Sequence, residues 1–312
     1  MMLSRLAENL YWYSRYLERA EGLARLINVN AHLNMDLPGR LAPGWEPLIR
    51  ITGHSTLFAE QYGDALVEKT VVKFLLSDAR NPASIRSSLE RARENLRSAR
   101  DLLPREIWER MNTLYLDAEA QFKSALSKRK RQDWLDQLTL GCQQMTGMLM
   151  GTMSQDHAYD FILIGRYLER ADMITRIIDV RAFDLLPDEL EELPPFESIQ
   201  WMGVLKSLSA YQMYRRHVRV RVSGPEVLAF LLKNPQFPRS VLFCLRWLAS
   251  RLAALPGNDD QALRRVVELM RKVQQAPSER LKDQSLSQFL DQVQIDLAEV
   301  DRLISQTWLP AE

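Results

Sequence analysis

The sequence contains few of the residues that break helices or cross-link a chain. Its 312 residues include 12 glycines, 14 prolines and two cysteines, Cys142 and Cys244. Few helix breakers, together with abundant Leu, Arg, Glu and Ala, predict an all-α protein. The two cysteines lie too far apart for a zinc-binding Cys-x-x-Cys pair, and they are typical of small apolar helix residues in a reducing compartment.

No charge of one sign dominates, and no long apolar run occurs. The 41 basic residues are balanced by 40 acidic ones, so that the net charge is +1, and nothing global favours a nucleic acid or a membrane surface as partner. No run approaches the roughly 18 apolar residues of a membrane span, and Arg5 and Glu8 precede any apolar run of a signal peptide. We therefore expect a cytoplasmic protein without membrane or nucleic-acid partners.

The four histidines also lack the neighbours that metal chemistry needs. Di-iron sites in helical bundles use Glu-x-x-His on two helices, but Val29, Ile51, Ser154 and Tyr214 stand three residues before the histidines. Glycine-rich phosphate-binding motifs and a Gly-x-Ser-x-Gly nucleophile elbow are missing as well. We expect no metal and no cofactor.

What the chain does contain is a charged segment that it uses twice. Arg15-Tyr16-Leu17-Glu18-Arg19-Ala20-Glu21 returns as Arg166-Tyr167-Leu168-Glu169-Arg170-Ala171-Asp172, 151 residues later. Wound at 100° per residue, the helix with the first copy is apolar on both sides, which is typical of a central, buried helix. Buried charges persist only when they are paired. We therefore predict that the charges of the two copies pair with each other.

In the structural interpretation of this motif, Glu18 pairs with Arg170 or Arg166. Glu169 correspondingly pairs with Arg19 or Arg15. In the functional interpretation, the carboxylates act as acid or base in a polar pocket, and the arginines hold an anionic group. The structural one is favoured, because buried ion pairs without a nucleophile or metal usually fix the packing of a core. The candidate catalytic residues are Glu18 and Glu169, and the candidate anion-binding residues are Arg15, Arg19, Arg166 and Arg170.

Further matches extend the repeat along the chain. Trp45 matches Trp201 and Phe74-Leu75-Leu76 matches Phe230-Leu231-Leu232, while Pro82-Ala83-Ser84-Ile85 matches Pro238-Arg239-Ser240-Val241, all at an offset of 156. Ordered matches at this period indicate a tandem duplication rather than a solenoid. We predict an internally duplicated helical bundle with a pseudo-two-fold axis and roughly six helices in each of residues 1–152 and 153–312. The acidic, proline-rich segment Pro187–Glu197 is expected to be an exposed loop.

A second group of arginines comprises Arg215, Arg216, Arg219 and Arg221, close to Tyr211 and Tyr214. The planar guanidinium forms paired hydrogen bonds with carboxylates and phosphates. Arg215 and Arg216 are therefore candidates for binding an anionic substrate group or an acidic patch of a partner. The alternative is a solvated helix end, where cations complement the helix dipole.

The segment Met2-Leu3-Ser4-Arg5-Leu6-Ala7-Glu8-Asn9-Leu10-Tyr11-Trp12, which runs into the first charged motif, resembles the bacterial alpha-E domain family. Tyr214-Arg215-Arg216 and the segment 237–244 also fit that family, so the resemblance covers essentially the whole chain. Members are encoded beside, or fused to, circularly permuted ATP-grasp amide ligases and transglutaminase-like peptidases. The resemblance implies a part in making or removing amide-linked peptide modifications.

The resemblance leads us to expect a helical accessory protein of an ATP-grasp-type amide or peptide ligase, either non-catalytic or substrate-presenting, in peptide synthesis or protein modification. The ligase is the expected partner, and a transglutaminase-like peptidase is a second candidate. One alternative is an enzyme that uses a central Glu/Arg site on a peptide or amino-acid derivative, and another is a purely structural scaffold. The substrate, the ligase-contacting surface and the oligomeric state stay open.

Overall fold

The computed structural model describes residues 4–37, 42–183, 194–218, 221–257, 260–281 and 283–309. Within these ranges the chain forms fourteen α-helices, one short 3-10 helix and no strand, which confirms the predicted all-α class. The first seven helices are α1 (Ser4–Asp36), α2 (Glu46–Thr52), α3 (Ser55–Tyr62), α4 (Glu68–Leu76), α5 (Ile85–Ser98), α6 (Arg105–Ala125) and α7 (Lys128–Thr152), with the 3-10 helix η1 (Arg100–Leu102) between α5 and α6. The next seven are α8 (His157–Phe183), α9 (Pro194–Ser207), α10 (Tyr211–His217), α11 (Gly224–Lys233), α12 (Val241–Leu252), α13 (Gln261–Gln275) and α14 (Asp283–Trp308).

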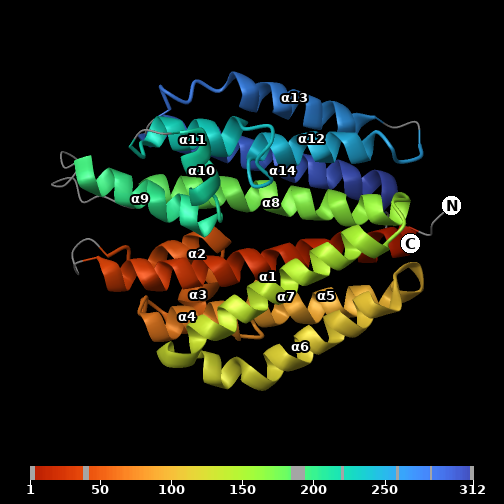
Figure 1. Cartoon of the computed structure of the whole chain (residues 1–312), viewed down its shortest axis with the longest axis horizontal. Helices are drawn as coiled ribbons and strands as arrows, with labels where there is room; N and C mark the ends of the chain where they lie inside the picture. The colour runs from red at the N-terminus through yellow and green to blue at the C-terminus, as the bar shows by residue number, and fades with distance from the viewer. Residues whose placement is uncertain are drawn as a thin grey trace.

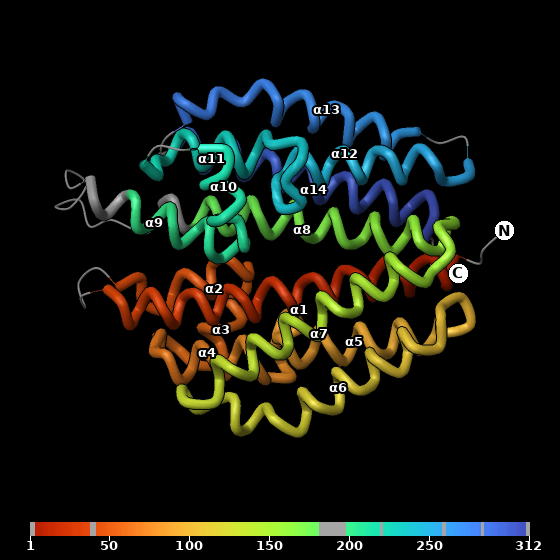
Figure 2. Tube along the Cα trace, in the orientation of Figure 1, coloured from red at the N-terminus to blue at the C-terminus, as the bar shows by residue number. Residues whose placement is uncertain are grey.

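Helices α1 and α8, which carry the two charged motifs, lie side by side in the middle of the molecule (Figure 1). The path of the chain in Figure 2 shows that both begin at the same end of the molecule and run in the same direction. Helices α5 and α7 pack on α1, whereas α12 and α14 pack on α8, and α6 and α13 form the outermost layers. Each central helix is therefore covered on several sides, as the apolar residues on both of its sides predicted.

Gly165 allows the two central helices to approach each other closely. A Cβ atom at this position would lie 2.3 Å from both the carbonyl oxygen of Tyr11 and the hydroxyl oxygen of Ser14 on α1. Any side chain at position 165 would thus force the helices apart. The close approach is what brings the charged residues of α1 within hydrogen-bonding distance of those on α8.

The segment after α1 forms two short helices, α2 and α3. Helix α2 ends at Gly53, which has a left-handed φ of 71°, and α3 starts two residues later. Another break, between α9 and α10, contains Ser209, which has a φ of 52°. A left-handed residue stops a helix because it turns the backbone out of the helical path. These two breaks raise the helix number before and after residue 153 to seven among the described residues, against the roughly six predicted.

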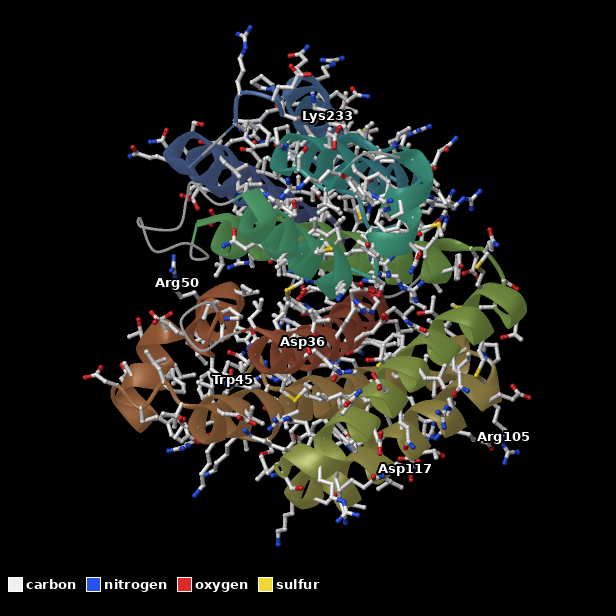
Figure 3. All side chains as sticks on the ribbon, turned by 60° about the vertical axis from the view of Figure 1, so that its left-hand side comes forward. Asp36, Trp45, Arg50, Arg105, Asp117 and Lys233 are labelled. Atoms are coloured by element: carbon white, nitrogen blue, oxygen red, sulfur yellow. The ribbon has the colours of Figure 1, made fainter. Side chains whose placement is uncertain are left out.

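Apolar side chains from both groups of helices form one continuous core, and charged side chains cover the outside. In Figure 3 the exposed side chains of Arg105 and Asp117 on α6 lie at the outer edge of the molecule. Cys142 on α7 and Cys244 on α12 are buried free thiols, as expected of small apolar helix residues. None of the helices in the described ranges combines the length and the apolar character of a membrane span.

The predicted loop Pro187–Glu197 lies largely outside the described residues, since these exclude 184–193. Its last part was predicted wrongly, because α9 begins at Pro194. Proline is tolerated in the first turn of a helix, where its missing N–H group would have no partner within the helix.

Candidate functional site

The first of two buried ion clusters is centred on Glu169 of α8, and we call it the Glu169 cluster. Arg19 on α1 donates to this carboxylate from Nε to Oε1 at 2.6 Å and from Nη2 to Oε2 at 3.0 Å. Arg15, one turn earlier, donates from Nε to Oε2 at 2.9 Å. The Nη1 atom of Arg15 lies 2.8 Å from Oδ1 of Asp301 on α14, which also accepts a hydrogen bond from the Tyr11 hydroxyl.

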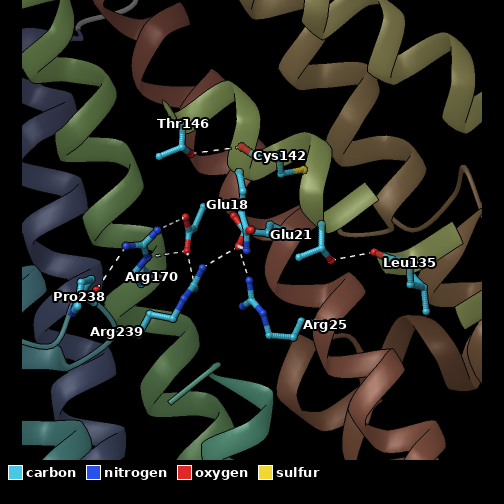
Figure 4. A network of polar contacts seen from close by, with 11 residues as sticks. Glu18, Glu21, Arg25, Leu135, Cys142, Thr146, Arg170, Pro238 and Arg239 are labelled. Carbon is cyan, nitrogen blue, oxygen red and sulfur yellow. Dashed lines mark hydrogen bonds and ion pairs between the residues drawn. The ribbon is translucent and has the colours of Figure 1, made fainter. Parts of the chain in front are cut away.

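The second cluster is centred on Glu18 of α1, and we call it the Glu18 cluster (Figure 4). Arg170 on α8 donates from Nε to Oε1 and from Nη2 to Oε2 of Glu18, both at 2.7 Å. Arg239, which directly precedes the N-cap of α12, reaches the same carboxylate with Nη1 at 3.2 Å. The Nη2 atom of Arg239 donates to Oε1 of Glu21 at 2.7 Å, and Arg25 also pairs with Glu21.

The pairing predicted across the two charged motifs is present. Of its two predicted partners, Glu18 pairs with Arg170, while Glu169 pairs with both Arg15 and Arg19. Arg166 is buried near Glu18, but its Nη2 atom has no hydrogen-bond partner within the described part of the chain. Its positive charge nevertheless contributes to the low pKa of Glu18. The catalytic and anion-binding roles considered for these residues stay predictions.

Both central carboxyl groups are held in the ionised form. Burial alone would raise the pKa of Glu169, but the charges and hydrogen bonds of Arg19 and Arg15 outweigh it and lower this pKa to about 2. Burial likewise opposes ionisation of Glu18, and Arg170 and Arg239 overcome it, so that its pKa falls well below the usual range. A general acid or base works best with a pKa near the working pH. Neither carboxyl group meets this condition at neutral pH.

Arg239 occupies an unfavourable position for a cation. Its side chain is mostly enclosed, with 14% of its surface exposed. Burial and the neighbouring charges of Arg25 and Arg170 lower its pKa to about 10, against the opposing effect of Glu18 and Glu21. Arg239 therefore stays charged at neutral pH mainly because two carboxylates face it.

A cavity of about 300 Å³ opens beside Glu169. Asp172 and Arg176 form an ion pair at 2.8 Å at its edge and are partly exposed. The space beside Glu18 measures only about 10 Å³ and is lined by Arg239 itself. The cavity beside Glu169, which we call the Ala83 cavity, is lined by residues that include Arg15, Arg19, Gly53, His54, Ala83, Glu169, Asp172 and Arg176.

Two members of these clusters were missed by the sequence reasoning. Arg239 was noted only as a position in the repeat match, although it is the single charged residue in the stretch Phe237–Cys244, which was a signal. Asp301 lies at one of many acidic positions in the amphipathic helix α14, and nothing in its surroundings distinguishes it. Both residues lie outside the repeated motif, Arg239 in the loop before α12 and Asp301 on α14.

The arginines near residue 215 lie apart from the buried clusters. Arg215 and Arg216 are exposed on α10, and Arg219 lies outside the described residues. Tyr214 does not join them at the surface, because it is fully buried and packs edge-on against Phe230. Arg221 donates from Nε to the hydroxyl of Ser198 on α9 at 2.9 Å. Anion recognition by Arg215 and Arg216 stays a prediction.

Metal-ligating residues do not gather in the described ranges. The described ranges contain no group of three or more His, Cys, Asp or Glu side chains placed to hold a metal ion. The carboxylates of the two central clusters face arginines instead.

A family model described as a predicted alpha-helical domain with a conserved ER motif matches residues 2–309. Uncharacterized proteins of Mycobacterium bovis and Mycobacterium tuberculosis are 24% identical to this chain over 320 residues. These matches cover 95% of the chain but 34% of each relative, so the chain spans about a third of the length of the curated relatives it matches. No solved structure matches the chain.

Proposed function

Because this chain belongs to the Alpha-E family, we propose that it is a non-catalytic helical accessory protein that presents a substrate to an ATP-grasp-type amide or peptide ligase. The observation that carries the non-catalytic role is the state of the two central carboxylates. Glu18 and Glu169 are each bound by two arginines and have lowered pKa values, so each is a weak base whose oxygens already accept hydrogen bonds from arginines. The ligase partnership itself follows from the family resemblance.

The curated relatives support a role beside another domain. The matched region makes up 34% of their length, so most of each relative consists of other sequence. A domain that occurs within longer chains is suited to act on a neighbour, in the same chain or in a separate one. The greater length of the relatives therefore supports an accessory role.

In this proposal the buried ion pairs fix the position of α1 against α8. Charged groups removed from water are strongly disfavoured unless each finds its partner, so a shifted register would leave several arginines and carboxylates unpaired. The pairs thereby specify one arrangement of the two central helices. Because α1 and α8 are fixed relative to each other, the helices packed around them can present a bound substrate in one defined position.

We also infer that the chain is an internal duplication, with a pseudo-two-fold axis between α1 and α8. The order of the helices supports this, because α4, α5 and α6 start 156 residues before α11, α12 and α13. The local geometry supports it as well. Ser84 and Ser240 each cap a helix by accepting a hydrogen bond from the backbone N–H three residues later, and Gly53 and Ser209 share the left-handed conformation. Both pairs have the offset of 156.

The ligase partnership is tested by producing this chain together with an ATP-grasp ligase encoded beside it. We expect the two to copurify, and we expect ligase-dependent ATP turnover with an amine and a carboxylate substrate to rise when the chain is added. A double variant, Glu18→Gln with Glu169→Gln, provides the test for catalysis. If the folded double variant bound both the ligase and the substrate like wild type and yet lost all stimulation, the non-catalytic role would be wrong.

A further inference from the structure

The two ion clusters correspond position by position, yet one is filled and the other is open. At the offset of 151, Glu18 corresponds to Glu169, and Glu21 corresponds to Asp172. At the offset of 156, Arg239 corresponds to Ala83. An arginine therefore enters one cluster at the point where the other has only a methyl group.

On the filled side, Arg239 bridges two carboxylates. Its Nη1 atom lies 3.2 Å from Oε1 of Glu18, and its Nη2 atom lies 2.7 Å from Oε1 of Glu21. The guanidinium occupies nearly all of the space, and about 10 Å³ is left. The protein thus contains its own example of the group that fits between these two carboxylates.

On the open side, the counterpart carboxylates line the Ala83 cavity of about 300 Å³. Among the described residues, Asp172 has one arginine partner, Arg176, whereas Glu21 has both Arg25 and Arg239. The side chains of Asp172 and Arg176 are 23% and 34% exposed, so that the cavity is accessible from solvent. Its volume is within the range of small-ligand pockets.

The balance of arginines and carboxylates also differs between the filled and the open cluster. Four arginines surround Glu18 and Glu21 in the filled cluster, namely Arg25, Arg166, Arg170 and Arg239. The open cluster has three arginines, and Asp301 adds a third carboxylate to Glu169 and Asp172. The filled cluster accordingly carries two positive charges more than its carboxylates neutralise, and the open cluster carries none. An added guanidinium would face three arginines on the open side, as Arg239 does on the filled side, but also one more carboxylate, Asp301, which pairs with Arg15 and does not line the cavity. It would therefore meet less repulsion than Arg239 does.

An anion in this cavity would find each of the lining arginines already paired with a carboxylate. Arg15 and Arg19 pair with Glu169, and Arg176 pairs with Asp172. An added anion would have to share these donors and would lie close to two carboxylates, which costs free energy in a partly buried site.

We propose that the Ala83 cavity binds a guanidinium group, held between Glu169 and Asp172 as Arg239 is held between Glu18 and Glu21. The group belongs either to a small guanidino compound or to an arginine side chain of a peptide. For the accessory role, this makes an arginine-like group the part of the substrate that the protein holds. The inference rests on the proposed duplication and does not depend on the ligase partnership.

The test is isothermal titration of the isolated full chain, without a ligase, with two probes. Agmatine represents a free guanidino compound, and the tripeptide Gly-Arg-Gly represents a peptide side chain. Citrulline, which has a neutral ureido group of nearly the same shape, and glutarate, a dianion, serve as controls. We expect at least one guanidinium probe to bind and neither control to do so, because only a guanidinium donates charged hydrogen bonds to both carboxylates.

Two variants locate the binding. Ala83→Arg places a guanidinium in the cavity from within the chain and should abolish probe binding. Asp172→Asn, at the accessible edge, should weaken binding roughly tenfold or more by removing one charged acceptor. Glu60→Gln, an exposed carboxylate on α3, is the matched control and should bind like wild type. Circular dichroism verifies that each variant is folded.

The results of these titrations distinguish the two possible sources of the guanidinium, and some of them would refute the proposal. Binding of agmatine indicates a free small molecule, whereas binding of the tripeptide alone indicates a peptide. Binding of glutarate without either guanidinium probe, no binding of any probe, or undiminished binding to folded Asp172→Asn would each overturn the proposal. Since no ligase is present, a failed copurification with the ligase would leave this result unaffected.

Discussion

Replacing Glu169 by glutamine tests how much the buried charge pairs stabilise the fold. Glutamine keeps the shape of the side chain and removes its charge, leaving Arg15 and Arg19 without an ionic partner. The folded pKa of Glu169 is about 2, against an ordinary 4.5. At about 1.4 kcal/mol for each pKa unit, the ionised form contributes about 3 kcal/mol to the free energy of unfolding. This agrees with the roughly 3–5 kcal/mol for removing one partner of a buried pair.

The same argument predicts a pH dependence. The folded pKa of Glu169 lies below the unfolded value, so its contribution is complete above the unfolded pKa and is lost as the pH falls from 4.5 towards 2. The difference in stability between wild type and Glu169→Gln should therefore be about 3 kcal/mol at neutral pH, and it should shrink to about 1 kcal/mol near pH 3.

Urea unfolding followed by circular dichroism at several pH values measures this difference. Glu109→Gln is the matched control, because Glu109 pairs with Arg105 at 2.6 Å in an exposed position on α6. Its effect should stay below about 1 kcal/mol at every pH. If Glu169→Gln were no more destabilising than this control, or if its effect were independent of pH, the assigned role of the pair would be refuted.

Three further predictions concern the contacts of α1 with α8, a helix cap and the exposed arginines. Gly165→Ala should destabilise the protein by about 1–3 kcal/mol in thermal unfolding, because the methyl group would lie 2.3 Å from oxygen atoms of α1; Gly147→Ala, with open space around it, should not. Ser240→Ala should cost about 1 kcal/mol in urea unfolding, because the N-cap of α12 is lost, and an unchanged stability would contradict the capping role. Arg215→Ala with Arg216→Ala should weaken binding to the ligase or to an anionic substrate and reduce its salt dependence, measured by titration at two ionic strengths; wild-type binding would point to a solvated helix end.

Much of the fold could be predicted from the sequence because the signals are local. Few glycines and prolines and a helical spacing of apolar residues suffice for an all-α class. Apolar residues on both sides of α1 indicated its central position. The breaks at Gly53 and Ser209 were missed, because a glycine or serine within a helical pattern adopts the left-handed conformation only where the surrounding packing requires it.

The sequence by itself determined that the charges on α1 and α8 must pair with each other. Buried carboxylates need cations, and the doubled motif offers Glu18 and Glu169 only a few choices. Only the tertiary structure decided which pairs form and which side of the central helices stays open. Arg239 lies in the loop before α12 and Asp301 lies on α14, so their contacts depend on how distant segments pack and not on any local pattern. For the same reason, the cavity at Ala83 could not be predicted, because its lining combines residues of α1 and α8 with Gly53, His54 and Ala83 from the segments between helices.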